Sequence, residues 1–303
     1  MNRLTSALTR VAGATAAALA ATLALTGAAA LTAAPAHAAS KVKTNDYDRD
    51  GVSDLVAVNR NDNCLYRWSG NGSGGFRTGT KLGCGWQNYV DSLVAVGDIN
   101  RDGVGDLVAI NKVDGYLYRW YGNGSGSFGA SARLGYGWSA FGDGRLFSAG
   151  DINRDGVGDL IGMNGVSGAV VRWYGNGAGS FGAAAQIDSQ TDGEIWYFRY
   201  DLTGAGDLNK DGVGDVIGWN PHYTCPSRFL GNGAGNYGPS YTLTIFCQVL
   251  DMAGMGDLNG DGIGDVVGKG EGFRLHVGLG DGRGGIARDL TLGPGWEPFA
   301  FAR

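Results

Sequence analysis

Acidic side chains recur in this chain at a spacing that suits a divalent cation. The nonapeptide Asp98-Ile99-Asn100-Arg101-Asp102-Gly103-Val104-Gly105-Asp106 returns in close copies that begin at Asp46, Asp151, Asp207 and Asp257. Asp or Asn at the first, third and fifth positions, Gly at the sixth and Asp at the ninth form a tight loop whose oxygen atoms converge on one point. Hard oxygen ligands, with no Cys or His among them, favour calcium over zinc or copper.

In each copy the expected calcium ligands are the side chains of the first, third, fifth and ninth residues and the backbone carbonyl of the seventh. Copy by copy they are Asp46, Asp48, Asp50, Val52 and Asp54; Asp98, Asn100, Asp102, Val104 and Asp106; Asp151, Asn153, Asp155, Val157 and Asp159; Asp207, Asn209, Asp211, Val213 and Asp215; and Asp257, Asn259, Asp261, Ile263 and Asp265. The sequence therefore predicts about five Ca²⁺ ions, one for each loop.

The nonapeptide has two other possible interpretations. An EF-hand needs Glu at the twelfth position and a helix on either side, whereas Ala57 and Ala109 hold that position inside apolar runs. Metal-free Asx turns would account for the Asp, Asn and Gly residues. Three or four carboxylates within nine residues would then repel each other without a cation to offset their charge. We therefore expect calcium loops placed between strands.

The loops also explain the charge of the chain. Lys and Arg number 24 and Asp and Glu 29, which gives a formal net charge of −5. More than half of the acidic residues lie in the loops, so the acidity reflects metal binding and not a surface made for basic partners. Because no stripe of Lys and Arg is present, nucleic acid is not an expected partner.

Residues 1–38 are typical of a secretory signal peptide. Arg3 and Arg10 accompany an Ala- and Leu-rich stretch over about 11–31, and Ala36-His37-Ala38 forms a cleavage site. A retained membrane anchor is the alternative, but Thr, Gly and Pro interrupt the stretch. No later segment has the ~20 apolar residues of a spanning helix. The sequence predicts a secreted, extracellular protein that does not span a membrane.

Four cysteines in an exported chain predict disulfide bonds. Aligning the repeats places Cys64 and Cys84 at the positions of Tyr116 and Tyr136 in the second unit. Cys225 aligns with Cys64, and Cys247 falls near the Cys84 position. We expect the bridges Cys64–Cys84 and Cys225–Cys247, each between neighbouring strands of one unit, and a cross-strand pair of Tyr116 and Tyr136.

Each unit contains four short strands separated by Gly and Asn turns. In the second unit they lie at about 106–110, at 117–121, in a segment that ends at Leu134, and around 146–149. No ten-residue window shows a helical period. The fold prediction for residues 39–303 is all-β, a five-bladed β-propeller of four-stranded antiparallel blades with repeats starting near 46, 98, 151, 207 and 257. A parallel β-helix is the rival architecture, but its rungs are shorter than this repeat.

Two segments compete to complete the first blade. Residues 298–303 follow Gly295-Trp296 as Leu93–Val96 follows Gly85-Trp86, which favours a strand at the C-terminal end. Residues 41–44 are the other candidate. The sequence leaves both open.

The loop and a second motif together resemble a known family. Asp-x-Asn-x-Asp-Gly-x-x-Asp, then an apolar strand, then Gly-Asn-Gly-x-Gly-x-Phe/Tyr-Gly, as at residues 122–129 and 231–238, is similar to the FG-GAP/VCBS repeat of integrin-like propellers. The resemblance covers the chain after the leader. It implies an extracellular calcium-binding propeller that serves binding or adhesion, often beside secreted enzymes. Integrin-like rings have seven blades where this chain has five repeats, and the fifth unit departs from the pattern at Val277, Gly278 and Asp281.

A glycan-binding function is expected from the Leu-Gly-x-Gly-Trp loops that end at Trp86, Trp138 and Trp296. Indole rings stack on the apolar faces of sugars, and repeated weak sites gain by multivalency. The unit plan also resembles the five-bladed tachylectin-type lectins. The alternative is that these indoles wedge between blades. Trp68, Trp120 and Trp173 lie within strands and are expected in the core.

Two further functions stay open: a protein-binding scaffold or adhesin, and a polysaccharide lyase or glycosidase. Catalysis is not expected, because His222 and His276 are the only histidines after the leader and no catalytic constellation stands out. A unique site would lie in the irregular fourth unit. That region holds Glu194, Trp196, Tyr197, Arg199, Tyr200, His222 and Tyr223. The oligomeric state is not predicted.

Overall fold

The computed structural model describes residues 45–187, 202–219 and 224–303. The chain divides into two units, residues 1–37 and 38–303, and every described residue belongs to the second. The expected signal peptide, residues 1–38, therefore lies outside the described residues.

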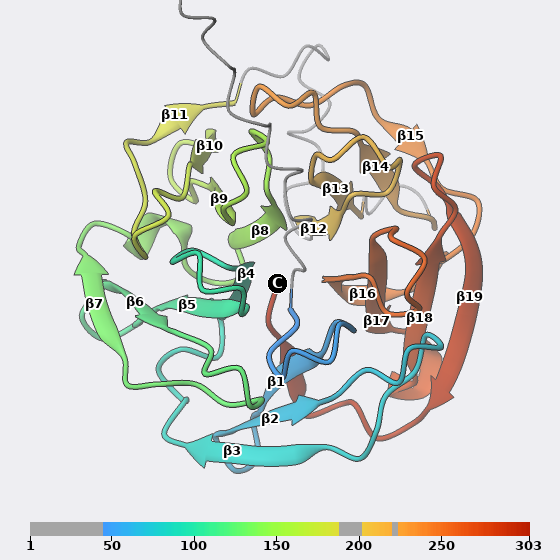
Figure 1. Ribbon diagram of the computed structural model, residues 1–303, viewed down its shortest axis with the longest axis horizontal. Helices are drawn as coiled ribbons and strands as arrows, with labels where there is room; N and C mark the ends of the chain where they lie inside the picture. Colours follow the sequence, from blue (N-terminus) through green and yellow to red (C-terminus); the bar gives the residue numbers. More distant parts are fainter. Residues whose placement is uncertain (1–44, 188–201, 220–223) are drawn as a thin grey trace, which may run out of the picture. The chain divides into compact units, whose positions relative to one another are not determined.

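Five four-stranded antiparallel sheets surround a common centre in Figure 1, which confirms the predicted five-bladed propeller. From the innermost to the outermost strand, the blades are β20 (Phe299–Phe301), β1 (Leu55–Asn59), β2 (Cys64–Trp68) and β3 (Thr80–Cys84); β4 (Val94–Gly97), β5 (Asp106–Ile110), β6 (Leu117–Trp120) and β7 (Ala132–Gly135); β8 (Leu146–Gly150), β9 (Asp159–Met163), β10 (Val170–Trp173) and β11 (Ala185–Gln186); β12 (Leu202–Gly206), β13 (Asp215–Gly218), β14 (Ser227–Phe229) and β15 (Tyr241–Thr242); and β16 (Leu250–Gly256), β17 (Asp265–Lys269), β18 (Leu275–Gly280) and β19 (Ile286–Gly293). Short 3-10 turns lie at η1 (Ser139–Phe141) and η3 (Glu271–Phe273). No helix within the described ranges has the length and apolar character needed to cross a membrane.

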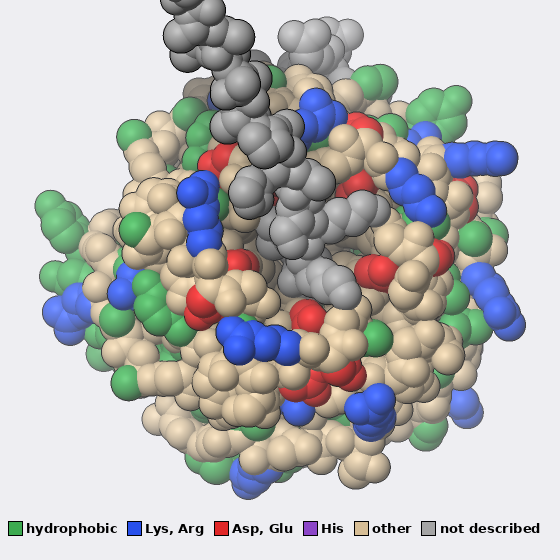
Figure 2. Space-filling model, viewed as in Figure 1, with side chains coloured by type: hydrophobic (Ala, Val, Ile, Leu, Met, Phe, Trp, Pro, Cys, Tyr) green, Lys and Arg blue, Asp and Glu red, His purple; other side chains and the backbone are tan. Residues whose placement is uncertain are grey.

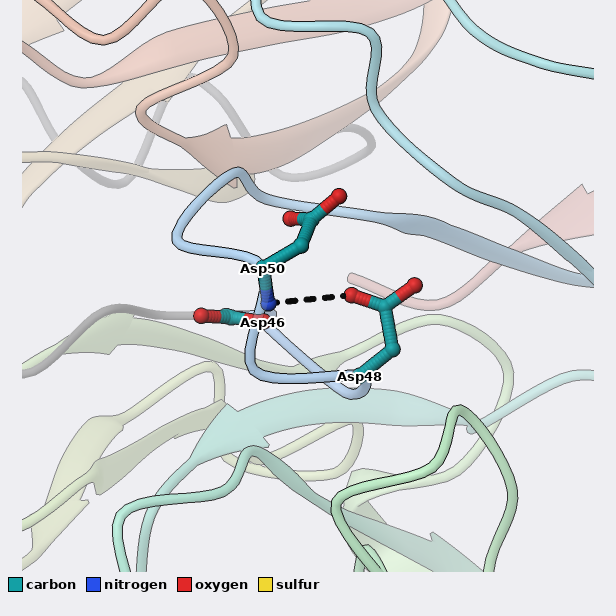
Figure 3. Close-up of side chains that lie close together, drawn as sticks. All are labelled: Asp46, Asp48 and Asp50. Atoms are coloured by element: carbon teal, nitrogen blue, oxygen red, sulfur yellow. Dashed lines mark hydrogen bonds between the residues drawn. The ribbon is translucent and has the colours of Figure 1, made fainter.

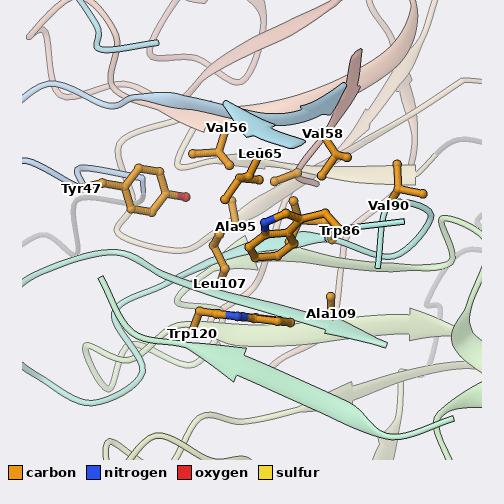
Figure 4. Close-up of a cluster of buried hydrophobic side chains, with 12 residues drawn as sticks. Tyr47, Val56, Val58, Leu65, Trp86, Val90, Ala95, Leu107, Ala109 and Trp120 are labelled. Carbon is orange, nitrogen blue, oxygen red and sulfur yellow. The ribbon is translucent and has the colours of Figure 1, made fainter. Parts of the chain in front are cut away.

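The core lies between adjacent blades. The second strand of a blade is buried on both faces, as every residue of β5 and of β9 shows, because the neighbouring blades cover it. Figure 4 shows one such interface, in which Val56 and Leu65 of the first blade meet Leu107 and Trp120 of the second. The outermost strands are largely exposed, as in β3. This burial explains why the second strands are continuous apolar runs and the outer strands are polar.

The propeller closes through its last strand. β20 pairs antiparallel with β1, with Phe301 opposite Ala57. Beyond β20, the Ala302 N–H donates to the Val56 carbonyl and the Arg303 N–H to the Leu93 carbonyl, each at 3.0 Å. The C-terminal candidate for the closing strand is confirmed, and the competing residues 41–44 lie outside the described residues.

Both expected disulfides are present. Cys64 and Cys84 are directly opposed in the pairing of β2 with β3. Cys225 precedes β14 and bonds to Cys247 in the connection from β15 to β16. The Tyr116 and Tyr136 rings occupy the matching place in the second blade, with centroids 6.1 Å apart. The repeat alignment thus predicted all three contacts.

Tyr237 provides a test of core packing. It holds the position of Phe76, Phe128 and Phe181 in the other Gly-rich turns, and its buried hydroxyl has no hydrogen-bond partner within the described ranges. A buried, unsatisfied hydroxyl destabilises a fold by about 1–3 kcal/mol. We expect Tyr237→Phe to stabilise the protein by about 1 kcal/mol and to raise the melting temperature by about 2–4 °C. Phe181→Tyr is the converse variant, and a Tyr237→Phe variant that melts lower than the parent would contradict this account.

Candidate functional site

Each acidic nonapeptide folds into a turn held by its own side chains. In the second loop, Asp98 Oδ1 accepts from the Arg101 N–H at 2.6 Å and Asp98 Oδ2 from the Gly103 N–H at 2.8 Å. Asp102 Oδ1 accepts from the Val104 N–H at 2.9 Å. The third loop repeats these bonds with its corresponding residues. Acids at the first and fifth positions therefore shape the loop as well as charging it.

The ninth residue has a role that the sequence did not reveal. Asp159 is fully buried, and its carboxylate accepts from the Ile152 N–H at 2.9 Å and from the Gly175 N–H at 2.8 Å. The corresponding Asp54, Asp106, Asp215 and Asp265 make the same two kinds of bond. Each carboxylate thus ties its loop to the Gly-rich turn of the same blade. The acidic loop and the Gly-rich turn lie at a nearly constant distance in sequence, and this spacing is the feature from which the bond between them could have been predicted.

Burial of the ninth-position carboxylates changes their acidity. It raises the pKa of Asp106, Asp159, Asp215 and Asp265 from 3.8 to about 7. Burial, and secondarily the Asp48 carboxylate, raises the pKa of Asp54 to about 6. Ionised carboxylates at these positions therefore need nearby positive charge.

These shifts predict how calcium dependence varies with pH. Without metal, a carboxyl with a raised pKa adds stability that is fully present below pH 3.8 and is lost as the pH rises through about 7. We expect added calcium to restore the lost stability, because a bound cation favours the ionised form of the carboxyl. We expect the calcium-induced rise in melting temperature to be larger at pH 8 than at pH 5. Equal rises at the two pH values would contradict this.

The first loop gathers three carboxylates. One ligand oxygen each from Asp46, Asp48 and Asp50 lies within 4.8 Å of the others, and no second group of three His, Cys, Asp or Glu side chains meets this closely in the described part of the chain. In Figure 3 the three side chains project from one tight turn, and the Asp50 N–H donates to Asp48 Oδ1 at 3.3 Å. Asp46 Oδ1 is buried and has no hydrogen-bond partner among the described residues. A buried oxygen with a free lone pair beside two other carboxylates fits a hard divalent cation.

The other loops have an amide in place of the middle carboxylate. In the second loop, Asn100 Nδ2 donates to Asp102 Oδ2 at 3.0 Å, while Asn100 Oδ1 accepts from the Asp102 N–H at 3.0 Å. In the first loop, Arg67 Nη1 lies 2.7 Å from Asp48 Oδ2 and 2.9 Å from Asp54 Oδ2. The guanidinium therefore offsets part of the extra negative charge of the first loop.

The five loops form a closed ring of backbone hydrogen bonds. The N–H of the eighth residue in each loop donates to the carbonyl of the first residue in the preceding loop. The five bonds are Gly105 to Asp46 at 3.2 Å, Gly158 to Asp98 at 3.1 Å, Gly214 to Asp151 at 2.8 Å, Gly264 to Asp207 at 2.8 Å and Ser53 to Asp257 at 3.1 Å. A Cβ on Gly158 would lie 1.9 Å from the Val96 carbonyl oxygen of the neighbouring blade, which explains the glycine. Figure 2 shows acidic side chains at intervals around the centre of the visible face, with Lys and Arg beside them.

The three indoles proposed to contact a ligand pack against the next blade. Trp86 lies on Trp120, with ring centroids 4.7 Å apart. Trp138 lies on Trp173 at 4.7 Å and Trp296 on Trp68 at 4.9 Å. Trp86 is only 9% exposed, whereas Trp138 and Trp296 are half-buried. These contacts are those expected of wedges between blades, and ligand binding by the three indoles stays a prediction.

In the second of the three Leu-Gly-x-Gly-Trp loops, the variable position is occupied by an exposed aromatic residue, Tyr136. Tyr136 is 81% exposed and lies beside Tyr116. The Arg133 guanidinium stacks 4.2 Å from the Tyr116 ring centroid and donates to the Tyr118 hydroxyl at 3.1 Å, and that hydroxyl donates to Asp114 Oδ2 at 2.8 Å. We call Asp114, Tyr116, Tyr118, Arg133 and Tyr136 the Tyr136 platform. The sequence paired the two tyrosines but did not indicate this exposure.

The residues considered for catalysis are mostly outside the described residues. Glu194, Trp196, Tyr197, Arg199, Tyr200, His222 and Tyr223 all fall there. His276 lies on β18, with its Nδ1 2.9 Å from Asp289 Oδ1 on β19.

The FG-GAP-like repeat family matches residues 46–109 and 98–162, so the chain contains FG-GAP-like repeats over this part. No curated protein matches the chain.

The chain is similar to three solved structures at low sequence identity. They are an Agrocybe aegerita lectin described as recognising non-reducing terminal N-acetylglucosamine (22% identity, 83% of this chain and 65% of that chain, TM-score 0.48), AofleA from Arthrobotrys oligospora (12%, 80% and 69%, 0.43), and a Photorhabdus luminescens Tc holotoxin pore (20%, 78% and 11%, 0.41). The chain thus spans 65% of the length of the first and 11% of that of the toxin. At these identities, the function must rest on the chain's own residues.

Proposed function

We propose that this chain is a secreted, calcium-binding propeller that acts as a non-catalytic glycan-binding module. Support for the extracellular setting comes from the leader-like residues 1–38 and from the two disulfides, which persist in oxidising compartments. The proposed ligands are glycans of a cell wall or another extracellular polymer.

Calcium binding is supported by the acidic loops and the FG-GAP-like repeats that contain them. The unpartnered Asp46 Oδ1 and the close carboxylates of Asp48 and Asp50 suit a hard cation in the first loop. The oxygen atoms of the other four loops suit further ions. Bound calcium supplies the positive charge that lets these carboxylates stay ionised side by side.

The observation that carries the glycan proposal is the Tyr136 platform. An exposed aromatic ring offers a flat apolar surface to the C–H face of a sugar. Asp114 can accept from a sugar hydroxyl and Arg133 can donate to one, and both are held in place through the Tyr118 hydroxyl. In the first blade the Cys64–Cys84 disulfide replaces the pair of Tyr116 and Tyr136. The first blade therefore has no equivalent of the Tyr136 platform.

A glycan array with the full chain in calcium tests the proposal. We expect the parent to bind a restricted set of sugars and Tyr136→Ala to weaken that binding about tenfold, which corresponds to the loss of one stacking contact. Tyr241→Ala is the matched control, because Tyr241 is also an exposed tyrosine beside an arginine but pairs with no aromatic ring in the described part of the chain. An array on which the parent binds nothing would contradict the proposed function.

A protein-binding scaffold is the second candidate. Val113, Val166 and Phe273 are exposed apolar residues on the hairpins between the second and third strands of three blades. A silent glycan array, together with a specific extracellular protein cross-linked at Val166, would favour this function over the first.

A further inference from the structure

The fourth residue of each acidic loop has no expected role as a calcium ligand, yet its geometry is unusual. Arg49, Arg101, Arg154 and Lys210 have φ of 61°, 64°, 66° and 65°, in the left-handed region. Side chains disfavour this region and glycine does not, and the fifth loop has Gly260 at the same place with φ 83°. Four long cationic side chains thus occupy a backbone conformation in which glycine would be less strained. Their side-chain contacts must offset this strain.

Each of these cations reaches the next loop. Arg49 Nη2 donates to the Asp102 carbonyl at 3.2 Å and Arg101 Nη2 to the Asp155 carbonyl at 3.5 Å. Arg154 Nη2 donates to the Asp211 carbonyl at 3.2 Å, and Lys210 Nζ to the Asp261 carbonyl at 3.1 Å. In every case the acceptor is the fifth residue of the next loop, whose side chain is an expected calcium ligand.

We infer that Arg49, Arg101, Arg154 and Lys210 are positioning residues that couple calcium binding between adjacent loops. The inference rests on the proposed calcium function. A loop ordered by its own ion holds its fourth residue in place, and that residue fixes the backbone of the fifth residue in the following loop. The following site is then partly ordered before its ion arrives, so its binding costs less conformational entropy. The backbone bonds of the loop ring supply a second connection between the same loops.

The series of side-chain bonds has one break. It runs from the first loop to the fifth, and Gly260 has no side chain with which to reach the first loop. The first loop differs in the other elements of its site as well, with Asp48 in place of Asn and Arg67 bonded to its carboxylates. We therefore expect the five loops to bind calcium as one coupled series, with no side-chain link between the fifth loop and the first.

Electrostatic repulsion and coupling through the backbone predict opposite effects of removing one of these cations, so a calcium-binding experiment can distinguish them. A cation beside a calcium site repels the ion, so its removal would tighten binding if charge alone mattered. Coupling through the backbone predicts weaker binding instead.

The experiment is a calcium titration of the full chain by calorimetry. We expect the parent to bind cooperatively, and Arg154→Gly, which reproduces the native fifth loop, to reduce the cooperativity and weaken the mean affinity of the coupled sites about fivefold. Arg154→Lys should restore both, since Lys210 makes the equivalent bond. Arg288→Ala removes one positive charge from the exposed face of β19 and should change neither.

Gly260→Arg is the reciprocal variant, and it should supply the missing link between the fifth loop and the first and raise the cooperativity of calcium binding above that of the parent. Non-cooperative binding by the parent, equal behaviour of Arg154→Gly and Arg288→Ala, or tighter binding by Arg154→Gly would each overturn the inference while leaving calcium binding intact. Absence of any calcium binding would instead defeat the proposed function on which it rests.

Discussion

Excess chelator is expected to lower the melting temperature of the full chain by at least about 20 °C and to broaden its unfolding transition. Each site with free calcium at 100 times its Kd adds about 2.7 kcal/mol to the free energy of unfolding. Several such sites in one ring together match the 5–15 kcal/mol of a typical domain. A change of 1 kcal/mol shifts the melting temperature of a chain of this size by about 2–4 °C. The metal-free ring should therefore be at the limit of stability.

Differential scanning calorimetry with and without chelator measures this effect. Calcium added back in excess should restore the original transition. Magnesium should restore much less, because it prefers a smaller octahedral site and gives up its water reluctantly. A melting curve unchanged by chelator would show that the loops do not use calcium for stability.

Asp159→Ala is expected to destabilise the protein by about 3–5 kcal/mol even at saturating calcium. The substitution leaves the buried Ile152 and Gly175 N–H groups without acceptors, and each such loss costs about 1–3 kcal/mol. It also detaches the third loop from the Gly-rich turn of its blade. Asp159→Asn keeps one acceptor oxygen and should lose less.

Urea unfolding in excess calcium measures the cost of the Asp159 substitution. Asp143→Ala is the control, since Asp143 is 82% exposed and bonds only to Arg145 among the described residues, and it should change stability by less than about 0.5 kcal/mol. If a large excess of calcium restored Asp159→Ala to the parent's stability, the residue would act through the metal alone. Persistent loss would confirm the structural bond.

Features that repeat in sequence could be predicted well. The blade count, the acidic loops and the pairing of Cys64 with Cys84 all follow from aligning one unit on the next. Contacts between blades could not be predicted in the same way. The bonds from Arg154 to Asp211 and from Gly158 to Asp98 depend on how closely two blades approach, which the pattern of one repeat does not specify. The exposure of Tyr136 depends on whether any other element covers the loop that follows β7.

The ninth-position acids show a second limit. The motif predicts that the ninth carboxylate is a metal ligand, but Asp106 also uses both oxygens to accept backbone N–H bonds. Sequence patterns identify residue types suited to a task. They do not exclude a second structural role, here the acceptance of backbone hydrogen bonds, for the same oxygen atoms.

The pairing of β20 with β1 has a consequence for how the protein reaches its native state during synthesis. The first blade is completed only by β20, which is synthesised after every other described strand of the ring, so the inner edge of β1 stays unpaired while the later blades form. Such a connection has a high contact order and folds slowly. During that interval the open edge can recruit a strand from another nascent chain, and this step is where we expect chaperone dependence and domain-swapped dimers to arise.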